Sequence, residues 1–303
     1  MQIFSTRTDR PHAYRFGETD NKLPFNPIEY AISADGTNWV SCFDVPNLQG
    51  VYMYDATLPD VNPADTYQAL GQQDGQTLMS SRYDQRDITC QFYSFGIDEA
   101  DQSLGYQALE RFLYARDEFW ITFSNHPGIK FRVKTKTFKP TYPNEKDFYA
   151  TVTFNNSAGL GQSLGTTQDV ENFDSELWAL GQNLRLDQDP QYSFQNIDRF
   201  TVVNIGDIMI EPDTKQHPLI ITIHCNGKPT LTNTTTGQTF SCNRVLTTND
   251  ELKLSGVNPF INGQQCGSDT NHGVISLQLG DNQFTLTGCT DSNISFDTPF
   301  YYV

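Results

Sequence analysis

One pentapeptide in the sequence has the spacing of a catalytic nucleophile. Residues 161–165 read GQSLG and match the pattern G-x-S-x-G, in which a strained turn between a strand and a helix exposes a serine hydroxyl. Such a turn needs a helix after it, whereas Ser163 is followed by LGTTQ, which does not favour one. A hydrolase of this kind also needs alternating strands and helices, which the sequence pattern lacks. We therefore interpret the match as a coincidence.

Other side chains suited to acid–base or metal chemistry are scattered along the chain. The histidines form no H-E-x-x-H pair and lie far apart, at His12, His126, His217, His224 and His272. The carboxylate pairs Asp98–Glu99 and Asp117–Glu118 have the chemistry of a glycosidase acid and base, but acidic residues at a helix start are usually caps. The sequence therefore predicts no enzyme, no metal site and no cofactor.

One pattern of charge is specific. In residues 129–139 (IKFRVKTKTFK) four cations alternate with uncharged residues, namely Lys130, Arg132, Lys134 and Lys136. Alternate residues of a strand point to the same face, so all four share one face if this segment is a strand. We call them the basic stripe. Two interpretations stay open: a solvated or lysine-protected edge, and a surface that meets an acidic neighbouring subunit or lines a passage for DNA.

The overall charge is strongly acidic. The 303 residues include 36 acidic and 20 basic side chains, a net charge of −16. Such a balance argues against a general nucleic-acid binder and against attraction to an anionic membrane. The longest apolar run, Leu219–Ile223, is too short to cross a bilayer, and the first residues predict no signal peptide. We therefore expect no membrane insertion. We also expect a folded protein, because 13% of residues are aromatic and disordered chains have few aromatic residues.

The cysteines predict free thiols. Six are present, at positions 42, 90, 225, 242, 266 and 289, and no two form a CxxC pair. A structural zinc site therefore has little support. An even number permits disulfides in an exported protein, but without a signal peptide buried free thiols are the better interpretation.

The first half of the chain reads as strands around one helix. Residues 87–95 alternate between apolar and polar, which predicts a half-buried strand with Ile88, Cys90 and Phe92 inside. A helix is predicted after Asp98, and its apolar stripe should pack on a sheet. That stripe consists of Leu104, Ala108, Leu109, Phe112 and Leu113.

The second half follows a change in composition. Residues 155–168 are rich in Gly, Ser, Thr and Asn and predict a flexible surface arm. Beyond residue 196 short strands recur about every 10–12 residues, the spacing of an antiparallel sandwich. The predicted strands there include 218–225, 230–234, 273–279, 283–287 and 293–296. We expect a β domain with one helix at 1–168, a connector at 169–195 and a β-sandwich at 196–303.

The order of these features resembles a known family. The segments that carry the likeness are DGTNWVSCFDVPNLQG, SRYDQRDITCQFYSFG, LGYQALERFLYARD, EFWITFSNHPGIKFRVK, FNNSAGLGQSLGTT, WALG and FTVVNIGDIMIEPDTKQHPLIITIHCNG. Together they resemble the distal tail protein (Dit) of siphophages that infect Gram-positive bacteria, over nearly the whole chain. Each segment is loosely specific, and their order and spacing carry the resemblance.

The resemblance implies a structural protein without catalytic activity. Its fold would be mainly β, with an N-terminal β-sandwich carrying one α-helix and an extended arm, and a C-terminal galectin-like antiparallel β-sandwich. The N-terminal domain would build a hexameric ring at the baseplate hub of the virion tail tip, after assembly in the host cytoplasm. The basic stripe would then face the lumen of the ring or an interface between subunits.

The resemblance also implies partners. They are further copies in a homo-hexamer, the major tail or tube proteins, the end of the tape measure, a tail-associated lysin or fibre, and receptor-binding proteins. DNA would pass transiently through the ring during host attachment and ejection.

One family property is not carried over. The galectin sugar signature, a His-x-Asn-x-Arg run with a tryptophan platform, is not found after residue 195, and Trp39, Trp120 and Trp178 all precede it. An alternative function remains, a carbohydrate-binding β-sandwich adhesin of a cell or virion surface.

Overall fold

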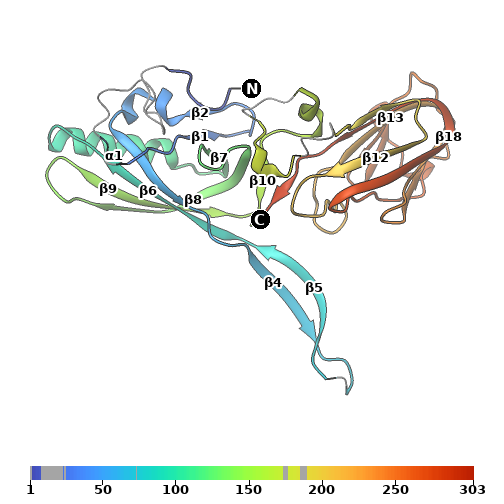
Figure 1. The fold of residues 1–303 in the computed structure, drawn as a ribbon, viewed down its shortest axis with the longest axis horizontal. Helices are drawn as coiled ribbons and strands as arrows, with labels where there is room; N and C mark the ends of the chain where they lie inside the picture. Colours follow the sequence, from blue (N-terminus) through green and yellow to red (C-terminus); the bar gives the residue numbers. More distant parts are fainter. Residues whose placement is uncertain (1, 8–22, 24, 73, 173–176, 185–189) are drawn as a thin grey trace. The chain divides into compact units, whose positions relative to one another are not determined.

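Two units, each with its own core, make up the chain (Figure 1). The computed structural model describes residues 2–7, 23, 25–72, 74–172, 177–184 and 190–303. The first unit contains residues 1–161 together with residue 303, and the second contains residues 162–302. Parts of the predicted connector, 173–176 and 185–189, lie outside the described residues.

The first unit is built on one antiparallel sheet. Its main path runs in the order β2-β1-β7-β8-β9-β6-β3. The strands are β1 (Tyr30–Ser33), β2 (Val40–Ser41), β3 (Val51–Thr57), β6 (Arg86–Ser94), β7 (Phe119–Phe123), β8 (Ile129–Thr141) and β9 (Phe148–Asn156). Two 3-10 turns, η1 (Cys42–Asp44) and η2 (Pro46–Leu48), follow β2. The N–H of Ile28, just before β1, donates to the carbonyl of Met53 in β3 over 2.8 Å, so the sheet curls until its two sides meet.

The inner face of this sheet carries the first core. Along β6 buried and half-buried residues alternate, and Ile88, Cys90 and Phe92 are fully buried, as predicted. Phe154 on β9 packs edge-on against Phe119 on β7, with ring centroids 6.1 Å apart. Each such side chain contributes roughly 1.5–3 kcal/mol by leaving water.

Helix α1 (Glu99–Leu113) packs on this core. Asp98 caps it, because its carboxylate accepts the N–H of Asp101 over 3.0 Å. Leu109 and Leu113 are fully buried and Phe112 is partly buried, so this part of the predicted apolar stripe is confirmed.

The prediction for the start of the helix is wrong. Leu104 is 63% exposed, while Gln102 is buried. The Gln102 amide donates to the carbonyls of Asn144 and Asp147, over 2.9 and 2.7 Å. The first turns of α1 therefore pack on the loop before β9 through the polar side chain of Gln102. Leu104 points away from this contact and stays in solvent.

A long hairpin extends from the first unit (Figure 1). It consists of β4 (Asn62–Gln68) and β5 (Thr77–Asp84), which pair only with each other along the described path of the chain. We call residues 62–84 the hairpin arm.

The predicted flexible arm at 155–168 is instead a packed segment. Leu160, Ser163 and Leu164 are buried, and strand β10 (Gly161–Ser163) lies within it. Its glycines serve close packing: a Cβ on Gly159 would lie 2.3 Å from the carbonyl oxygen of Asp84. The composition that resembled a flexible arm therefore reflects positions where no side chain fits.

The second unit is a sheet whose two longest strands serve two layers. Its path is β11-β18-β13-β15-β16-β17, with β12 also on β18 and β14 also on β13. The strands are β11 (Ser193–Gln195), β12 (Arg199–Asn204), β13 (Ile220–Asn233), β14 (Gln238–Ser241), β15 (Leu252–Ser255), β16 (Asn258–Ile261), β17 (Gln264–Gln265) and β18 (Gly280–Asp297). The short strand β19 (Tyr301–Tyr302) pairs with β10 and is not part of this sheet. The 3-10 turns are η3 (Thr167–Asn172), η4 (Leu180–Gln182) and η5 (Gly267–Asp269).

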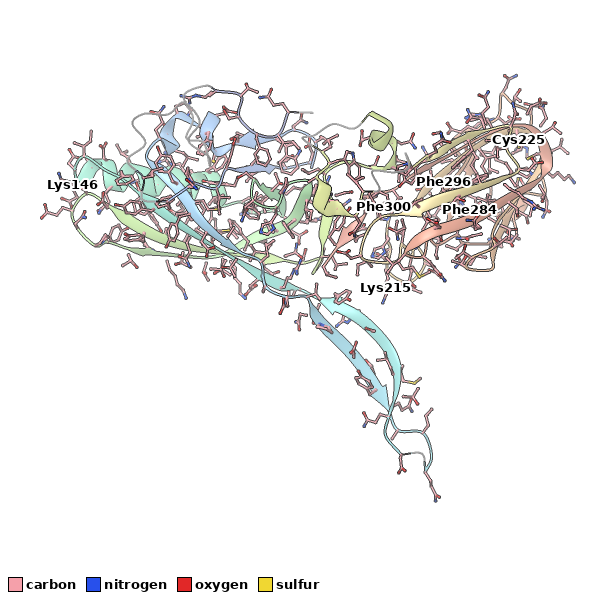
Figure 2. All side chains as sticks on the ribbon, viewed as in Figure 1. Lys146, Lys215, Cys225, Phe284, Phe296 and Phe300 are labelled. Carbon is pink, nitrogen blue, oxygen red and sulfur yellow. The ribbon has the colours of Figure 1, made fainter. Side chains whose placement is uncertain are left out.

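Bulges divide β13 and β18 into halves that fold onto each other. The register shifts between His224 and Asn226 and again between Gly227 and Thr230. Beyond these shifts Phe284, near the start of β18, packs against Phe296, near its end, at 5.1 Å (Figure 2). The predicted strands 218–225 and 230–234 are thus one strand with a bulge, and 283–287 and 293–296 are the two halves of another.

The predicted strand at 273–279 is wrong. This segment is irregular, and its ladder contact is a single bridge between Leu277 and Ile210. Alternating side chains can bury themselves in a loop that crosses a sandwich, so periodicity alone does not establish a strand.

The WALG segment anchors the second unit. Trp178 is 2% exposed, and its ring lies 6.0 Å from that of Phe300. A Cβ on Gly165 would come within 3.0 Å of the Trp178 ring. The mainly β, antiparallel fold class is confirmed, and no described helix is long and apolar enough to span a membrane.

Candidate interaction surface

The basic stripe lies on the outer face of the first sheet. Along β8, Phe131, Val133 and Thr135 are buried, while Arg132, Lys134 and Lys136 are exposed and Lys130 is half-buried. The alternation lasts until a bulge between Thr135 and Thr137. The predicted common face is therefore present, and the long strand β8 holds it straight.

Two of the four cations of the stripe form ion pairs with carboxylates nearby. The Nε atom of Arg132 lies 2.8 Å from Oε2 of Glu118, and Nζ of Lys136 lies 2.6 Å from Oδ2 of Asp87. The Lys130 ammonium lies 4.9 Å from the centre of the Trp120 ring, a cation–π contact.

These pairs set the local electrostatics. Burial raises the pKa of Asp87, but hydrogen bonds from Lys136 and Asn155 outweigh it and leave that pKa below its ordinary value. Lys134 forms no ion pair with any residue that the structure describes. Within the described part of the chain, the stripe therefore combines two ion-paired cations, a lysine over an aromatic ring, and Lys134, for which no ion pair is found.

An exposed group of aromatic rings occupies the other end of the same outer face. We call Phe25, Tyr54, Tyr93, Phe95 and Tyr149 the aromatic cluster. Tyr93 on β6 and Tyr149 on β9 are direct register partners, with rings 4.8 Å apart. Tyr93 also lies 4.5 Å from Phe95, and Phe25 lies 5.5 Å from Tyr54. Tyr149 and Phe95 stay 43% and 40% exposed, so the cluster presents apolar ring surface to solvent.

The hairpin arm exposes apolar side chains along its length. Tyr67, Leu78 and Met79 are 53%, 50% and 54% exposed. The arm also carries three aspartates against one arginine, Arg82, which lies 3.9 Å from Asp84. An isolated two-stranded hairpin is at best marginally stable in water, and this one buries almost none of its own apolar surface.

Ser163 is a structural residue. Its hydroxyl is fully buried, donates to the carbonyl of Gly165 over 2.6 Å and accepts the N–H of Phe300 over 2.9 Å. The hydroxyl both donates to and accepts from backbone groups. Ser163 therefore ties the segment before Tyr301 to strand β10. The interpretation of GQSLG as a coincidence agrees with this geometry.

The described histidines and acidic pairs hold structural positions. His217 stacks on Tyr301 at 4.3 Å and its Nδ1 accepts the N–H of Glu211 over 3.2 Å; burial lowers its pKa. Burial likewise lowers the pKa of His126, and His12 lies outside the described residues. Among described residues no three His, Cys, Asp or Glu side chains are placed to hold a metal ion.

All six thiols are free, as predicted. Five are buried, and Cys289 on β18 is half-buried.

The aromatic cluster and the hairpin arm were not predicted, although the sequence holds a signal for each. Asp74-Gly75 marks a hairpin turn, and aromatic residues two apart, such as Tyr52 with Tyr54 and Tyr93 with Phe95, mark one strand face. Neither signal shows that the surface stays uncovered, because exposure depends on the rest of the fold.

A family comparison identifies the part of the chain that carries these features. Residues 54–156 match the family described as phage tail protein RIFT-related domain. These residues are therefore similar to a phage tail domain, and we call residues 54–156 the phage tail domain. The phage tail domain contains the hairpin arm, the basic stripe and most of the aromatic cluster. No curated protein matches the sequence.

A solved structure shares the fold over most of the chain. The crystal structure of SPP1 Dit, titled a paradigm of the hub adsorption apparatus in Gram-positive-infecting phages, aligns with a TM-score of 0.58 and 12% identity, over 89% of this chain and 99% of that one. Two structures of the phage P2 baseplate in its activated conformation, with Ca and with Sr, align with TM-scores of 0.40 and 0.39 at 8% identity, over 90% of this chain and 98% and 97% of theirs. The resemblance to siphophage distal tail proteins is confirmed, by the phage tail domain and by the fold shared with SPP1 Dit.

Proposed function

We propose that this protein is a structural component of a siphophage baseplate hub and assembles as a hexameric ring at the tail tip. The ring joins the tail tube and the end of the tape measure to a tail lysin or fibre and to receptor-binding proteins. It performs no catalysis. Support comes from the phage tail domain at 54–156 and from the fold shared with a protein whose title describes a hub.

The observation that carries the proposal is the hairpin arm. It exposes Tyr67, Leu78 and Met79, which a lone subunit leaves in water. A surface of this kind gains stability when another chain covers it. A second copy supplies that cover if the arm of each subunit packs on the next.

Such an arrangement is head-to-tail, because the arm of one copy meets a different surface of its neighbour. Head-to-tail interfaces close into a ring when the rotation between neighbours divides a full turn. Permanent interfaces of this type typically bury about 2,000 Å² or more and concentrate aromatic side chains. The aromatic cluster supplies such side chains on the same unit.

We further propose that the basic stripe lines the lumen through which DNA passes. Arg132, Lys136 and Lys130 each have a partner in their own chain, and Lys134 has no ion pair with a described residue. Four free cations would hold phosphates, whereas a row in which two of the four are paired with carboxylates attracts DNA more weakly. Weak attraction suits a passage that DNA must traverse without being trapped.

Light scattering of the purified protein tests the ring. Six chains of 34.3 kDa have a mass of about 206 kDa, and negative-stain images of that peak should show an open centre. Replacing Tyr67, Leu78 and Met79 together with serine should reduce the mass to that of one chain. A wild-type protein that stays monomeric at all concentrations would contradict the proposal.

A matched control uses three exposed apolar residues of the second unit. Val245, Val257 and Leu279 are 67%, 48% and 55% exposed. Replacing these three with serine should leave the ring intact. Loss of the ring in this control as well would show that the hairpin arm is not its specific contact.

A charge reversal separates the lumen from an interface. Lys134→Glu should leave the mass of the ring unchanged and slow DNA ejection from assembled particles. Dissociation of the ring by this change would place Lys134 at a subunit interface instead.

The aromatic cluster favours a second candidate, carbohydrate binding. Exposed tyrosine faces can stack on the apolar faces of sugars, and Tyr149 is among the most exposed rings of the cluster. Binding on a glycan array that Tyr149→Ala abolishes would favour the adhesin. If glycan binding survives Tyr149→Ala and is lost only when the second unit is removed, the sugar site lies in the second unit and not in the aromatic cluster.

A further inference from the structure

Two cysteines of the second unit lie against each other. Cys225 lies on β13 and is fully buried, and Cys289 lies on the paired strand β18 and is half-buried. The two strands pair directly here, and the neighbouring Cys289 raises the pKa of the Cys225 thiol. Figure 2 labels Cys225 within this unit.

The bulge in these strands explains why the thiols meet. Cys289 is the register partner of Gly227, and Cys225 lies two residues before Gly227 on the same strand. A Cβ on Gly227 would lie 2.5 Å from the Gly288 carbonyl oxygen and 3.0 Å from the Cys289 Cα. Because Gly227 has no side chain, its backbone approaches the Cys289 backbone closely.

The glycine after the bulge brings the strands equally close. Gly288 has a φ of +77°, and a Cβ there would lie 2.3 Å from the Lys228 carbonyl oxygen. Two glycines therefore face each other across the bulge. The approach they permit is the approach that a cross-strand bond between neighbouring side chains requires.

The two thiols differ in reactivity. Cys289 is half-buried whereas Cys225 is fully buried, so Cys289 is the thiol that an oxidant in solution reaches first and is the attacking group. Burial raises the pKa of Cys42, Cys90 and Cys266, which holds these thiols in the unreactive form.

We propose that Cys225 and Cys289 are a modification site, closing into a cross-strand disulfide when the protein meets a small-molecule disulfide such as oxidised glutathione. The Cys289 thiolate attacks one sulfur of the oxidant, forming a mixed disulfide and releasing one glutathione thiolate. Cys225 then gives its proton to water, attacks the Cys289 sulfur and releases the second glutathione. Two protein thiols are oxidised and one small disulfide is reduced to two thiols.

The bond would tie β13 to β18 at the bulge where both strands pass from one layer to the other. If the proposed function holds, the tail-tip protein folds in a reducing cytoplasm and meets oxidants only after release. The disulfide would then strengthen the second unit outside the host. The bond itself does not depend on the ring, so its test is independent of the assembly state.

Intact-mass and peptide analysis of the full-length protein test the site. After incubation with oxidised glutathione at about pH 8, the mass should fall by about 2 Da, the loss of two hydrogens. Free thiols should fall from six to four, and a peptide pair should join Cys225 to Cys289. The melting temperature should rise and return to its starting value with a reductant.

Two variants make the result specific. Cys289→Ser should remove both the mass change and the thermal shift, whereas Cys242→Ser should keep them. Six free thiols after oxidation, a stable glutathione adduct on Cys289, or a bond to Cys242 would each overturn the proposal. Peptide mapping of the wild type decides the question even if a variant fails to fold.

Discussion

At the scale of single residues, pairing rather than number sets the charge of the basic stripe. Arg132 pairs with Glu118, just before β7, and Lys136 pairs with Asp87 on β6, while Lys134 between them forms no ion pair with a described residue. Exposed pairs of this kind contribute at most about 1 kcal/mol each, because water and salt screen them. These ion pairs therefore change the surface potential of the stripe more than they change the free energy of unfolding.

Lys136→Ala should raise the pKa of Asp87 towards its ordinary value, because the largest stabilisation of that carboxylate is lost. The lowered pKa contributes stability above the ordinary aspartate pKa of about 3.9, and this contribution disappears as the pH falls through the folded value. The free energy of unfolding should thus drop by no more than about 1 kcal/mol at pH 7, and the difference should vanish in acid.

An NMR titration of Asp87 with urea unfolding at several pH values measures both effects. Lys134→Ala on the same strand is the control, and it should leave the Asp87 pKa unchanged. Equal shifts in the two variants would show that the whole stripe, and not the Lys136 contact, sets that pKa.

At the scale of elements, a glycine after β9 allows the base of the hairpin arm to pack closely on the first unit. Gly159 has a φ of +71°, and its missing Cβ makes room for the end of β5 at the Asp84 carbonyl. The base of the hairpin arm is thereby clamped to the turn after β9. Its apolar tip region is left free for a partner.

Gly159→Ala should lower the free energy of unfolding by about 1–3 kcal/mol, since it adds both a clash and a strained φ. Gly71 is the matched control, because its φ is also positive, at +60°, but nothing lies within 4 Å of an added Cβ. Gly71→Ala should cost clearly less in urea unfolding. Equal costs would assign the effect to the backbone angle alone.

At the scale of the whole molecule, the two units have separate cores. The apolar cluster around Phe92, Phe131 and Phe154 lies wholly within the first unit. The second unit has its own buried rings, among them Phe284, Phe296 and Phe300. Cores of this kind can fold as independent domains.

A fragment of residues 157–303 should therefore fold alone. Its near-ultraviolet circular dichroism and amide NMR dispersion should match those of an ordered β protein, with one cooperative unfolding transition. A fragment with collapsed but unordered spectra would show that the second unit needs the first.

The sequence alone determined the local pattern of this protein. Alternation located β6 and β8, helix spacing placed α1, and period two put the basic stripe on one face. The order of motifs pointed to the distal tail family, which the match at 54–156 and the shared fold support. These features depend on neighbours within a few residues, so sequence spacing suffices to find them.

Tertiary structure decided what is covered and what is left exposed. The glycine-rich 155–168 looked flexible and is packed, Leu104 looked buried and is exposed, and residues 62–84 form an arm with bare apolar side chains. Cys225 and Cys289 meet only because a bulge and two glycines bring β13 and β18 together. Burial and contact between distant strands depend on which surfaces the whole chain brings together, and local spacing does not encode that information.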